Sequence, residues 1–488
     1  MKRYSIRIAI LIILGFYFLS GCGKQQRAQA STLGEFEQQL ADMLPRLLHA
    51  YRVPGVSVAL VDNAEVVWAQ GYGYSNEEAG TPVTGDTIFQ VASISKSITA
   101  WGVMRLVEEG KIDLDAPVAQ YLTGWSLPPS EFDQSAVTVR RLLSHTAGLA
   151  PWNYPGTLLQ ETPPAMVDLL SGTSSGEAVH LDRQPGERGQ YTNGGYLILQ
   201  LLVEDVTGEP FADYMQRAVL LPLRMQHSTF QGSPVIASSL ATGYQISGRP
   251  AEQRQYPEAA GGLYSTASDI ATWLAAGMSA SNAASAGRNV LQPQTVDLMY
   301  APVPVTAKNN NGLGVVVETL PDGKRMILHS GDVEGWRGQY TAIPDLGSGI
   351  VVLTNSSAGG RYLVADTICT WLFWAAGETP GVCQVYQAVY LLILILAGLI
   401  GVAVVVSVWR LVAQIRSQRR VLVWLPQAEK QRREVTLSFF TIAAWWLLVV
   451  PRLGALLPPT FGWITLAFSL WCLVTAARGF TTVPDEFA

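Results

Sequence analysis

The spacing of apolar residues changes several times along the chain. Apolar side chains recur three and four positions apart over residues 40–51, which is typical of an amphipathic helix. Over residues 55–60 and 65–72 they alternate with polar ones, as the two strands of a hairpin do. Residues 93–109 return to helical spacing. The pattern predicts a helix, a hairpin and a second helix at the start of a soluble segment, residues 34–377.

Helical patterns dominate the middle of this segment, and strand patterns return after it. The expected helices are 168–170, 195–206, 212–221, 267–278 and 362–374, and the expected strands are 314–319, 326–329, 339–343 and 349–353. Strands at both ends with helices between them predict an α+β fold, in which both ends build one antiparallel sheet. Helices flank this sheet and form a second, helical lobe, and we expect a cleft between the two.

The first 22 residues have the pattern of an export signal. Basic residues precede an apolar run over 8–19 that is short for a membrane span, and the run ends in small residues before Cys22. This ending resembles a bacterial lipoprotein cleavage box, in which Cys22 becomes a lipid-modified N-terminus; the alternative is an uncleaved signal anchor with a chance cysteine. Residues 23–33 are polar and predict a flexible tether.

Residues 378–488 are expected to anchor the chain in a membrane. An uncharged apolar stretch over 385–409 is long enough, at about 1.5 Å per residue, to cross a hydrocarbon core of roughly 30 Å, and weaker spans follow over 436–457 and 461–477. The loop after the first span is rich in Lys and Arg, so it is expected in the cytoplasm and the soluble segment outside. No Asp or Glu falls within the spans, which favours a plain anchor over a membrane domain with an ion or proton path.

Charge and cysteine content narrow the function classes. The formal net charge is −5 and the soluble segment has no Lys/Arg cluster, so binding of nucleic acid has no support. The five histidines and four cysteines show no zinc-site spacing, and we expect neither a metal nor another cofactor. For Cys369 and Cys383, the spacing alone leaves a disulfide and two free thiols equally open.

A Ser-x-x-Lys motif, Ser93 to Lys96, stands at the start of the helix predicted over 93–109. Residues three apart share a helix face, so the Lys96 side chain can reach the Ser93 hydroxyl. A serine needs a neighbouring base to act as a nucleophile, and lysine can serve if burial or positive charge lowers its pKa. The helix N-terminus also favours the oxyanion that forms when a carbonyl is attacked. Alone, the motif is common by chance.

Two further motifs follow in order. Tyr191 and Asn193 form a Tyr-x-Asn before a helix, and His329-Ser330-Gly331 ends a predicted strand, with a turn-rich stretch after it. Supporting stretches lie at residues 142–149 and 260–267. Together these motifs resemble those of the serine β-lactamase and penicillin-binding-protein superfamily, most closely its class C β-lactamase-like branch. The resemblance covers nearly all of the soluble segment and implies a β-lactamase/transpeptidase-like fold.

The resemblance also implies roles for the motif residues. Ser93 is similar to the acylated nucleophile, Lys96 to its proton partner, and Tyr191 to the hydroxyl that helps as a base in acylation and deacylation. Asn193 is similar in position to the residue that holds the amide of the substrate.

The third motif is implied to bind substrate. The strand that carries His329, Ser330 and Gly331 would line the cleft. The backbone amides of Ser93 and Asp332 would form the oxyanion hole.

His329 departs from the pattern of many family members, which have Lys-Thr-Gly in the third motif. An imidazole with an ordinary pKa is mostly neutral at pH 7, so it lends little charge to a substrate carboxylate. Weak β-lactam capture is therefore expected, unless Lys324, Arg325 or Arg337 supplies the charge from another direction.

Other patterns have a simpler interpretation. Gly172, Ser174 and Gly176 match the Gly-x-Ser-x-Gly of α/β-hydrolases, but no strand precedes them and no helix follows, so a loop is expected. His145 is expected to be a packed, hydrogen-bonded histidine.

The favoured function is a serine hydrolase at a bacterial cell membrane, with its catalytic domain outside. It would act through an acyl-enzyme on cell-wall peptides, β-lactams, or small esters and amides. That substrate and the lipid bilayer are the expected partners, and the sequence does not show whether it binds other proteins. A penicillin-binding sensor is the alternative, but the loop over 410–436 is too short for an output module. A non-hydrolytic cell-wall-binding protein is disfavoured because Ser93, Lys96 and Tyr191 are all present.

Overall fold

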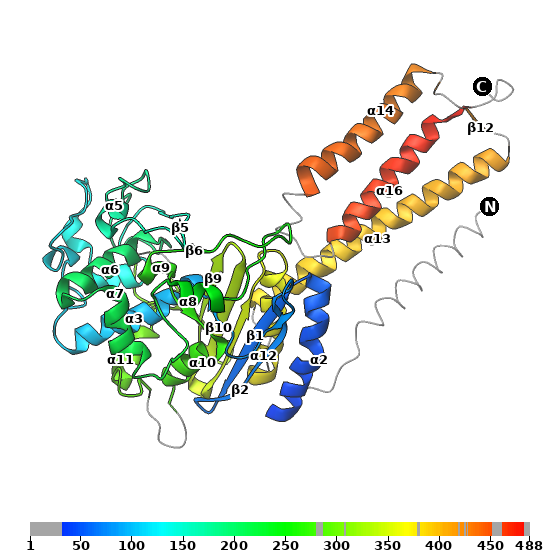
Figure 1. The fold of residues 1–488 in the computed structure, drawn as a ribbon. Coiled ribbons are helices and arrows are strands. Elements are labelled where there is room, and N and C mark those ends of the chain that lie inside the picture. The colour runs from blue at the N-terminus through cyan, green and yellow to red at the C-terminus, as the bar shows by residue number, and fades with distance from the viewer. Residues whose placement is uncertain are drawn as a thin grey trace. The chain divides into compact units, whose positions relative to one another are not determined.

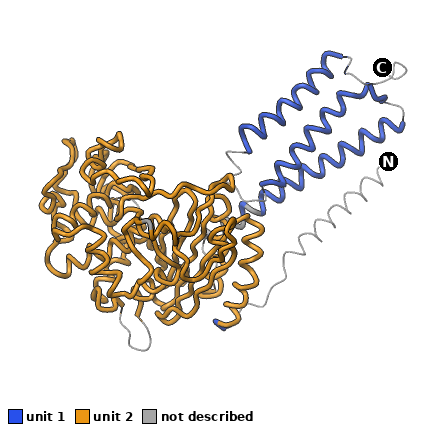
Figure 2. The backbone as a smooth tube through the Cα atoms, viewed as in Figure 1, with its two compact units in different colours: residues 1–33, 381–488 blue, residues 34–380 orange. Residues whose placement is uncertain are grey.

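The computed structural model divides the chain into two compact units, Gly34–Pro380 and a second made of residues 1–33 and 381–488 (Figure 2). The described residues are 32–279, 286–306, 309–377, 381–417, 420–423, 426, 428–450 and 461–482. The export signal, Cys22 and almost all of the tether lie outside them, so the predicted cleavage and lipidation stay predictions.

The larger unit is built on a seven-stranded sheet with the order β3-β2-β1-β11-β10-β9-β8 (Figure 1). Its strands are β1 (Gly55–Asp62), β2 (Glu65–Asn76), β3 (Thr81–Pro82), β8 (Val316–Thr319), β9 (Arg325–Val333), β10 (Trp336–Ile343) and β11 (Ser348–Thr354). All neighbours are antiparallel, and β1 pairs with β11, where Val58 lies opposite Val352. Both ends of the segment therefore build one sheet, which confirms the predicted α+β fold.

Helices cover the sheet and form the rest of the unit. The α-helices are α2 (Leu33–Tyr51), α3 (Ser95–Glu108), α4 (Val139–Leu143), α5 (Met166–Leu170), α6 (Gly194–Thr207), α7 (Phe211–Met215), α8 (Pro234–Ser239), α9 (Glu258–Gly261), α10 (Ala267–Ala276), α11 (Pro293–Met299) and α12 (Gly360–Ala376). Strands β1 and β11 are buried along almost their whole length, so both faces of the sheet centre are covered. Helix α10 contacts β1, β2 and β11, and α12 contacts β10 and β11.

Short elements join the helices to the sheet. Strand β4 (Phe89–Gln90) pairs with β7 (Tyr264–Ser265), and β5 (Thr157–Leu158) pairs with β6 (Arg254–Gln255). The 3₁₀ helices are η1 (Ala92–Ile94), η2 (Val118–Gln120), η3 (Gln134–Ala136) and η5 (Pro344–Leu346), and η4 (Gln216–Leu220) is a π-helix. Trp273 of α10 meets Trp101 of α3 and Tyr340 of β10 edge-on, with ring centroids 6.0 and 5.0 Å apart. These aromatic contacts fix α3 against the sheet through the core.

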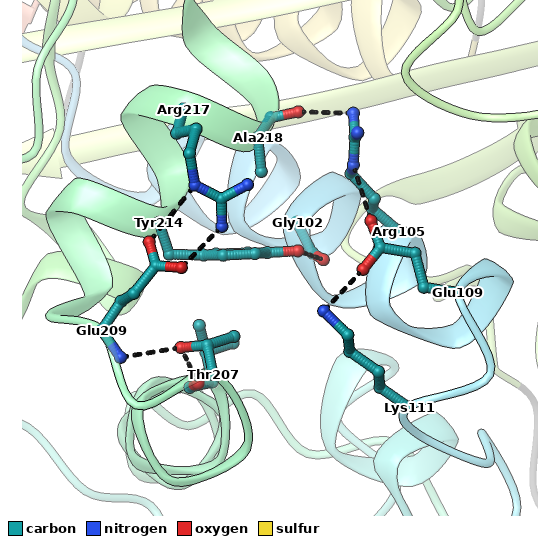
Figure 3. A network of polar contacts seen from close by, with 10 residues as sticks. Gly102, Arg105, Glu109, Lys111, Thr207, Glu209, Tyr214, Arg217 and Ala218 are labelled. Atoms are coloured by element: carbon teal, nitrogen blue, oxygen red, sulfur yellow. Dashed lines mark hydrogen bonds and ion pairs between the residues drawn. The ribbon is translucent and has the colours of Figure 1, made fainter.

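A polar network fixes the far end of α3 (Figure 3). Tyr214 of α7 donates a hydrogen bond of 2.8 Å to the carbonyl oxygen of Gly102, and Arg105 donates one of 3.0 Å to that of Ala218. A Cβ on Gly102 would lie 2.3 Å from the sulfur of Met215, so the glycine allows α7 to approach α3. The helix that begins next to Ser93 is therefore held at both ends.

Two element boundaries differ from the prediction. The helix expected over 93–109 begins as the 3₁₀ helix η1 and becomes α-helical only at Ser95. The turn expected after the third motif is present but shorter than predicted, because β9 runs through the motif to Val333 and β10 begins at Trp336, which leaves Glu334 and Gly335 as the turn. Gly338, which was expected in the turn, lies in β10 opposite Gly331.

The smaller unit contains α13 (Gly381–Arg416), α14 (Glu429–Ala444), the π-helix η6 (Trp445–Val449), α16 (Phe461–Gly479) and the short pair β12 (Val421–Leu422) and β13 (Thr481–Thr482). Among the described residues, Leu391–Arg416 and Phe461–Gly479 are long and apolar enough to cross a membrane, with mean hydropathy of 3.1 and 1.4. The span expected over 436–457 lies partly outside the described residues. Membrane insertion and topology stay predictions.

Candidate active site

Ser93, the predicted nucleophile, lies in the turn η1 between β4 and α3. The residue before it, Ala92, has a φ of +48°, in a region that residues other than glycine rarely adopt. Strand β9 passes beside this turn, and a Cβ added to Gly331 would lie 2.1 Å from the carbonyl oxygen of Val91. The third motif therefore needs glycine at this position to let the strand approach the turn that carries Ser93.

Lys96 and Tyr191 converge on the hydroxyl of Ser93. Lys96 Nζ lies 3.0 Å from Ser93 Oγ, and Tyr191 Oη donates a hydrogen bond of 2.6 Å to the same oxygen. Lys96 Nζ also lies 5.0 Å from the centre of the Tyr191 ring. The fold thus brings the first and second motifs together at one oxygen atom.

The ammonium form of Lys96 is disfavoured by its surroundings. The side chain is 0% exposed, and burial lowers its pKa well below the ordinary value. Its Nζ also donates a hydrogen bond to the carbonyl oxygen of Ala260 in α9. A neutral amine held in this way has a lone pair left to accept the proton of Ser93.

Tyr191 keeps its proton at neutral pH. Burial raises its pKa to about 12, although the hydrogen bond to Ser93 acts in the opposite direction. The residue is 50% exposed, so solvent moderates the shift, but both influences leave the phenol protonated near pH 7. Tyr191 can therefore pass a proton on only while it receives another.

His145 packs behind Tyr191, as expected of a structural histidine. The two rings lie 4.5 Å apart, the backbone N–H of Thr192 donates to His145 Nδ1 at 3.4 Å, and that of Gln190 donates to the His145 carbonyl at 2.7 Å. Burial, and then the charges of Lys96 and His329, lower the pKa of His145 well below its usual value. His145 is therefore neutral and supports the loop that carries the second motif.

His329 lies on β9 and is also neutral. It is 7% exposed, and burial and then Lys96 lower its pKa to about 4, against an opposing hydrogen bond with the Ser330 backbone. Its Nδ1 lies 2.8 Å from the carbonyl oxygen of Ser330, and its ring lies 6.3 Å from that of Tyr191. The third motif thus places an uncharged imidazole beside the other two motifs.

A cavity of about 290 Å³ opens beside Ser93. Its lining is Ala92, Ser93, Trp152, Asn153, Tyr154, Pro155, Asn193, Tyr256, Pro257, Ala260, Gly261, Asp332, Val333 and Glu334. Asn193 and Asp332 are therefore at the cavity, as predicted, whereas Tyr191, His329, Ser330 and Gly331 are not among these lining residues. The strand of the third motif reaches the cavity through its last residues, because the strand continues past the motif.

The amide of Asn193 is held on one side only. Its Nδ2 donates a hydrogen bond of 2.9 Å to Asn153 Oδ1. Its Oδ1 is buried and has no hydrogen-bond partner in the described part of the chain. A buried, unpaired carbonyl oxygen at the cavity wall can accept an N–H from a bound molecule.

The three cations that were expected to compensate for His329 are engaged elsewhere. Lys324 pairs with Asp322, and Arg325 pairs with Asp297 and Asp345. Arg337 forms an ion pair with Asp332 and donates a hydrogen bond of 3.1 Å to the carbonyl oxygen of Val333. Burial and the nearby Arg361 lower the pKa of Arg337 to about 10, so it stays charged but turned toward protein acceptors.

Sequence reasoning missed part of the site. The stretch over 260–267 was noted as support for the family, but its function, to hold Lys96 through the Ala260 carbonyl, is a backbone contact that no side-chain pattern reveals. Asn153, which holds the side chain of Asn193, belongs to none of the sequence motifs, so it was not predicted. Ser174 lies in a turn after α5 between Gly172 and Gly176, each with a φ of +80°, and no helix follows, so the loop is confirmed.

The profile of the beta-lactamase family matches residues 36–368. Protein flp of Staphylococcus aureus is 25% identical over 43% of this chain and 42% of its own length, and the unguisins hydrolase ungD' of Aspergillus campestris is 25% identical over 67% and 63%. The chain thus spans less than two thirds of the length of these relatives. A structure of the octameric penicillin-binding protein homologue from Pyrococcus abyssi is 27% identical over 72% of this chain and 81% of that one, with a TM-score of 0.60. The family match and the convergent motifs show that this chain belongs to the beta-lactamase family.

Proposed function

We propose that the chain is an exported, membrane-anchored serine hydrolase that works through an acyl-enzyme on Ser93. The observation that carries this proposal is the Ser93 oxygen itself, which lies 3.0 Å from a fully buried lysine amine and 2.6 Å from a protonated tyrosine hydroxyl. A serine with these two neighbours has both a proton acceptor and a proton relay within hydrogen-bond reach.

The acylation step follows from these contacts. As Ser93 Oγ bonds to the substrate carbonyl carbon, its proton moves to the amine of Lys96, and the carbonyl electrons move to the oxygen. The backbone amides of Ser93 and Asp332 would stabilise that oxyanion. When the oxyanion collapses and the carbonyl re-forms, the bond from the carbonyl carbon to the leaving nitrogen or oxygen breaks. Tyr191 gives its proton to that leaving amine or alkoxide and receives one from Lys96, so the acyl-enzyme forms while Lys96 and Tyr191 return to their starting protonation states. A water molecule hydrolyses it by the same path in reverse.

We further propose a class C β-lactamase-like enzyme whose substrates are small esters or amides, or cell-wall peptides cleaved away from a free C-terminal carboxylate, rather than carboxylated β-lactams. The neutral His329 and the engaged state of Lys324, Arg325 and Arg337 support this, because none of them offers a free charge to a carboxylate. Without a charge-assisted contact of about 1.5 to 3 kcal/mol, capture of such substrates would weaken by roughly one to two powers of ten.

Export and anchoring are supported by several features of the chain. Cys369 is disulfide-bonded, as cysteines in proteins of oxidising compartments often are. The two candidate spanning helices are only 11% and 28% buried, so protein covers little of their apolar surface. A reporter fused after Phe480 should be cytoplasmic and one inserted at Ala284 should be exported. The reverse pattern would overturn the topology.

The catalytic proposal is tested by incubating the full-length protein with penicillin, nitrocefin, a D-Ala-D-Ala peptide and nitrophenyl esters. Mass shift and turnover are both measured, and the acylated peptide is mapped. We expect the label on Ser93 and its loss in Ser93→Ala, with Ser174→Ala as the matched control. A label on Ser174, or unchanged turnover in Ser93→Ala, would refute the proposal.

A further inference from the structure

The cavity beside Ser93 has an uneven balance of charge. None of its described lining residues is Lys, Arg or His, whereas Asp332 and Glu334 both line it. Asp332 is ion-paired with Arg337, and with Arg361 at 3.7 Å, so its charge is already compensated. Glu334 is exposed and forms no salt bridge with any residue that the structure describes. Glu334 therefore lines the cavity with a carboxylate that has no salt bridge in the described part of the chain.

The nearest cations do not cancel this charge. Arg254 interacts electrostatically with Glu334, but its guanidinium pairs with Glu252 at 2.6 Å and donates to the Gly156 carbonyl at 3.1 Å. Lys96 is buried and its pKa is lowered, so it contributes little positive charge. Arg254 therefore offsets the negative charge of Glu334 only in part, and Glu334 lines the cavity.

A second cavity of about 180 Å³ lies next to the first. It shares Tyr154, Tyr256 and Pro257 with the first cavity, so the two adjoin. Its described lining again has no Lys, Arg or His and includes Glu204 and Glu258. Burial raises the pKa of both carboxyl groups, that of Glu258 to about 8, so Glu258 is mostly uncharged near pH 7 and Glu334 remains the main source of negative charge. Neither described lining has a cationic side chain that would attract an anion.

We infer that this region selects substrates with a positive charge, such as an ammonium group, on the acyl part, and that Glu334 is the specificity-determining residue. The inference rests on the proposed serine hydrolase function. The acyl part is the portion that stays bound once Ser93 is acylated, and in this inference it occupies the cavity that Ser93, Asn193 and Glu334 line. A cleft lined by one sign of charge, with low-dielectric walls, raises the local concentration of ligands of the opposite sign.

The test uses three p-nitrophenyl esters of matched length, made from ε-aminohexanoic, heptanoic and heptanedioic acid, so that the acyl end is cationic, neutral or anionic. The readout is the ratio of kcat/KM for the ammonium ester to that for heptanoate, with the full-length protein in detergent. We expect this ratio to fall roughly fivefold to tenfold in Glu334→Gln, and to fall toward the same value in native protein at high salt. In Glu334→Lys the anionic ester should become preferred over the cationic one.

The control is Glu131→Gln, which removes an exposed carboxylate that lines neither cavity and should leave the ratio as in native protein. An unchanged ratio in Glu334→Gln, or an equal fall in Glu131→Gln, would overturn the inference while leaving the serine hydrolase intact. If the proposed function itself is wrong, the result differs: no ester is hydrolysed in a way that depends on Ser93.

Discussion

Two parts of the candidate site differ in how they hold charge: the proton-transfer side, made of Ser93, Lys96 and Tyr191, and the capture side, made of the third motif from His329 to Gly331. On the proton-transfer side, Ser93, Lys96 and Tyr191 are complete, and burial of Lys96 favours the neutral amine that the chemistry needs. On the capture side, the same burial keeps His329 neutral, where many family members hold a cation. One physical cause, desolvation, thus activates the first side and removes charge from the second. The comparison suggests that the proton-transfer groups of the family are retained, whereas the charge that would favour carboxylated substrates is lost.

The largest expected effect lies on the proton-transfer side. Lys96→Ala and Tyr191→Phe should each lower the acylation rate about a thousandfold, because each removes one half of a single proton path. The double variant should be little slower than the slower single variant. Stopped-flow acylation by a neutral nitrophenyl ester measures all three rates, and Ser174→Ala serves as a control. Losses that simply multiply would mean that the two groups act independently.

The next largest effect is expected where Gly331 of β9 packs against the turn that carries Ser93. Gly331→Ala should slow acylation about a hundredfold and lower the free energy of unfolding by about 1 to 3 kcal/mol, because the new Cβ meets the Val91 carbonyl beside Ser93. Gly124→Ala is the matched control, since a Cβ there meets nothing within 4 Å. Acylation rates and denaturant unfolding are compared for both variants. If Gly331→Ala behaves like Gly124→Ala, the strand does not constrain the turn of Ser93.

On the capture side, His329→Lys should raise penicillin acylation by roughly one to two powers of ten, by restoring a charge-assisted contact to the carboxylate. The methyl ester of the same penicillin should change little. Arg337→Ala should leave the preference between the acid and its ester almost unaltered, because Arg337 is occupied by Asp332. Fast nitrocefin turnover by native protein that does not depend on the residue at position 329 would contradict the prediction that a neutral His329 weakens capture of β-lactams.

The sheet, the order of helices and the proximity of Ser93 to Lys96 were predictable from the sequence, because they follow local rules. Apolar spacing locates α2, α6 and α10, and a Ser-x-x-Lys at a helix start places its two side chains on one face. The position of Tyr191 next to Ser93 and Lys96 was predicted only from the resemblance to a known family. Spacing along the chain carries no information about which distant loop meets the helix.

The capture side was harder to predict. Gly338 was assigned to a turn because glycine favours turns, but it lies in β10 and allows the close approach of Leu353. Gly331 was predicted as the end of the motif, but the sequence does not show that it allows β9 to approach Val91. The pKa of His329 also depends on burial, which the sequence does not display, so an ordinary value was assumed where the structure gives about 4. The pairing of Arg337 with Asp332 is likewise a contact that strand register creates.

The smallest expected effect is a pH dependence that distinguishes an ordinary pKa of the His329 imidazole from the lowered pKa of about 4. With an ordinary pKa near 6.5, the imidazole would gain charge as pH falls from 8 to 6, and acylation by the penicillin would rise severalfold relative to its methyl ester. Since burial holds the pKa near 4, the ring stays neutral over this range, and the relative rate should change less than about twofold.

Only the protonated, positively charged imidazole attracts a carboxylate. The relative acylation rate of the penicillin should therefore rise only as pH falls toward about 4. Comparing the penicillin with its methyl ester cancels the titration of Lys96, which affects both substrates equally. His329→Gln serves as the control that cannot titrate, and native protein should match its flat profile between pH 6 and 8. A relative rate that climbs through pH 6.5 in native protein but not in His329→Gln would show that the imidazole is solvated, and that the capture side carries charge after all.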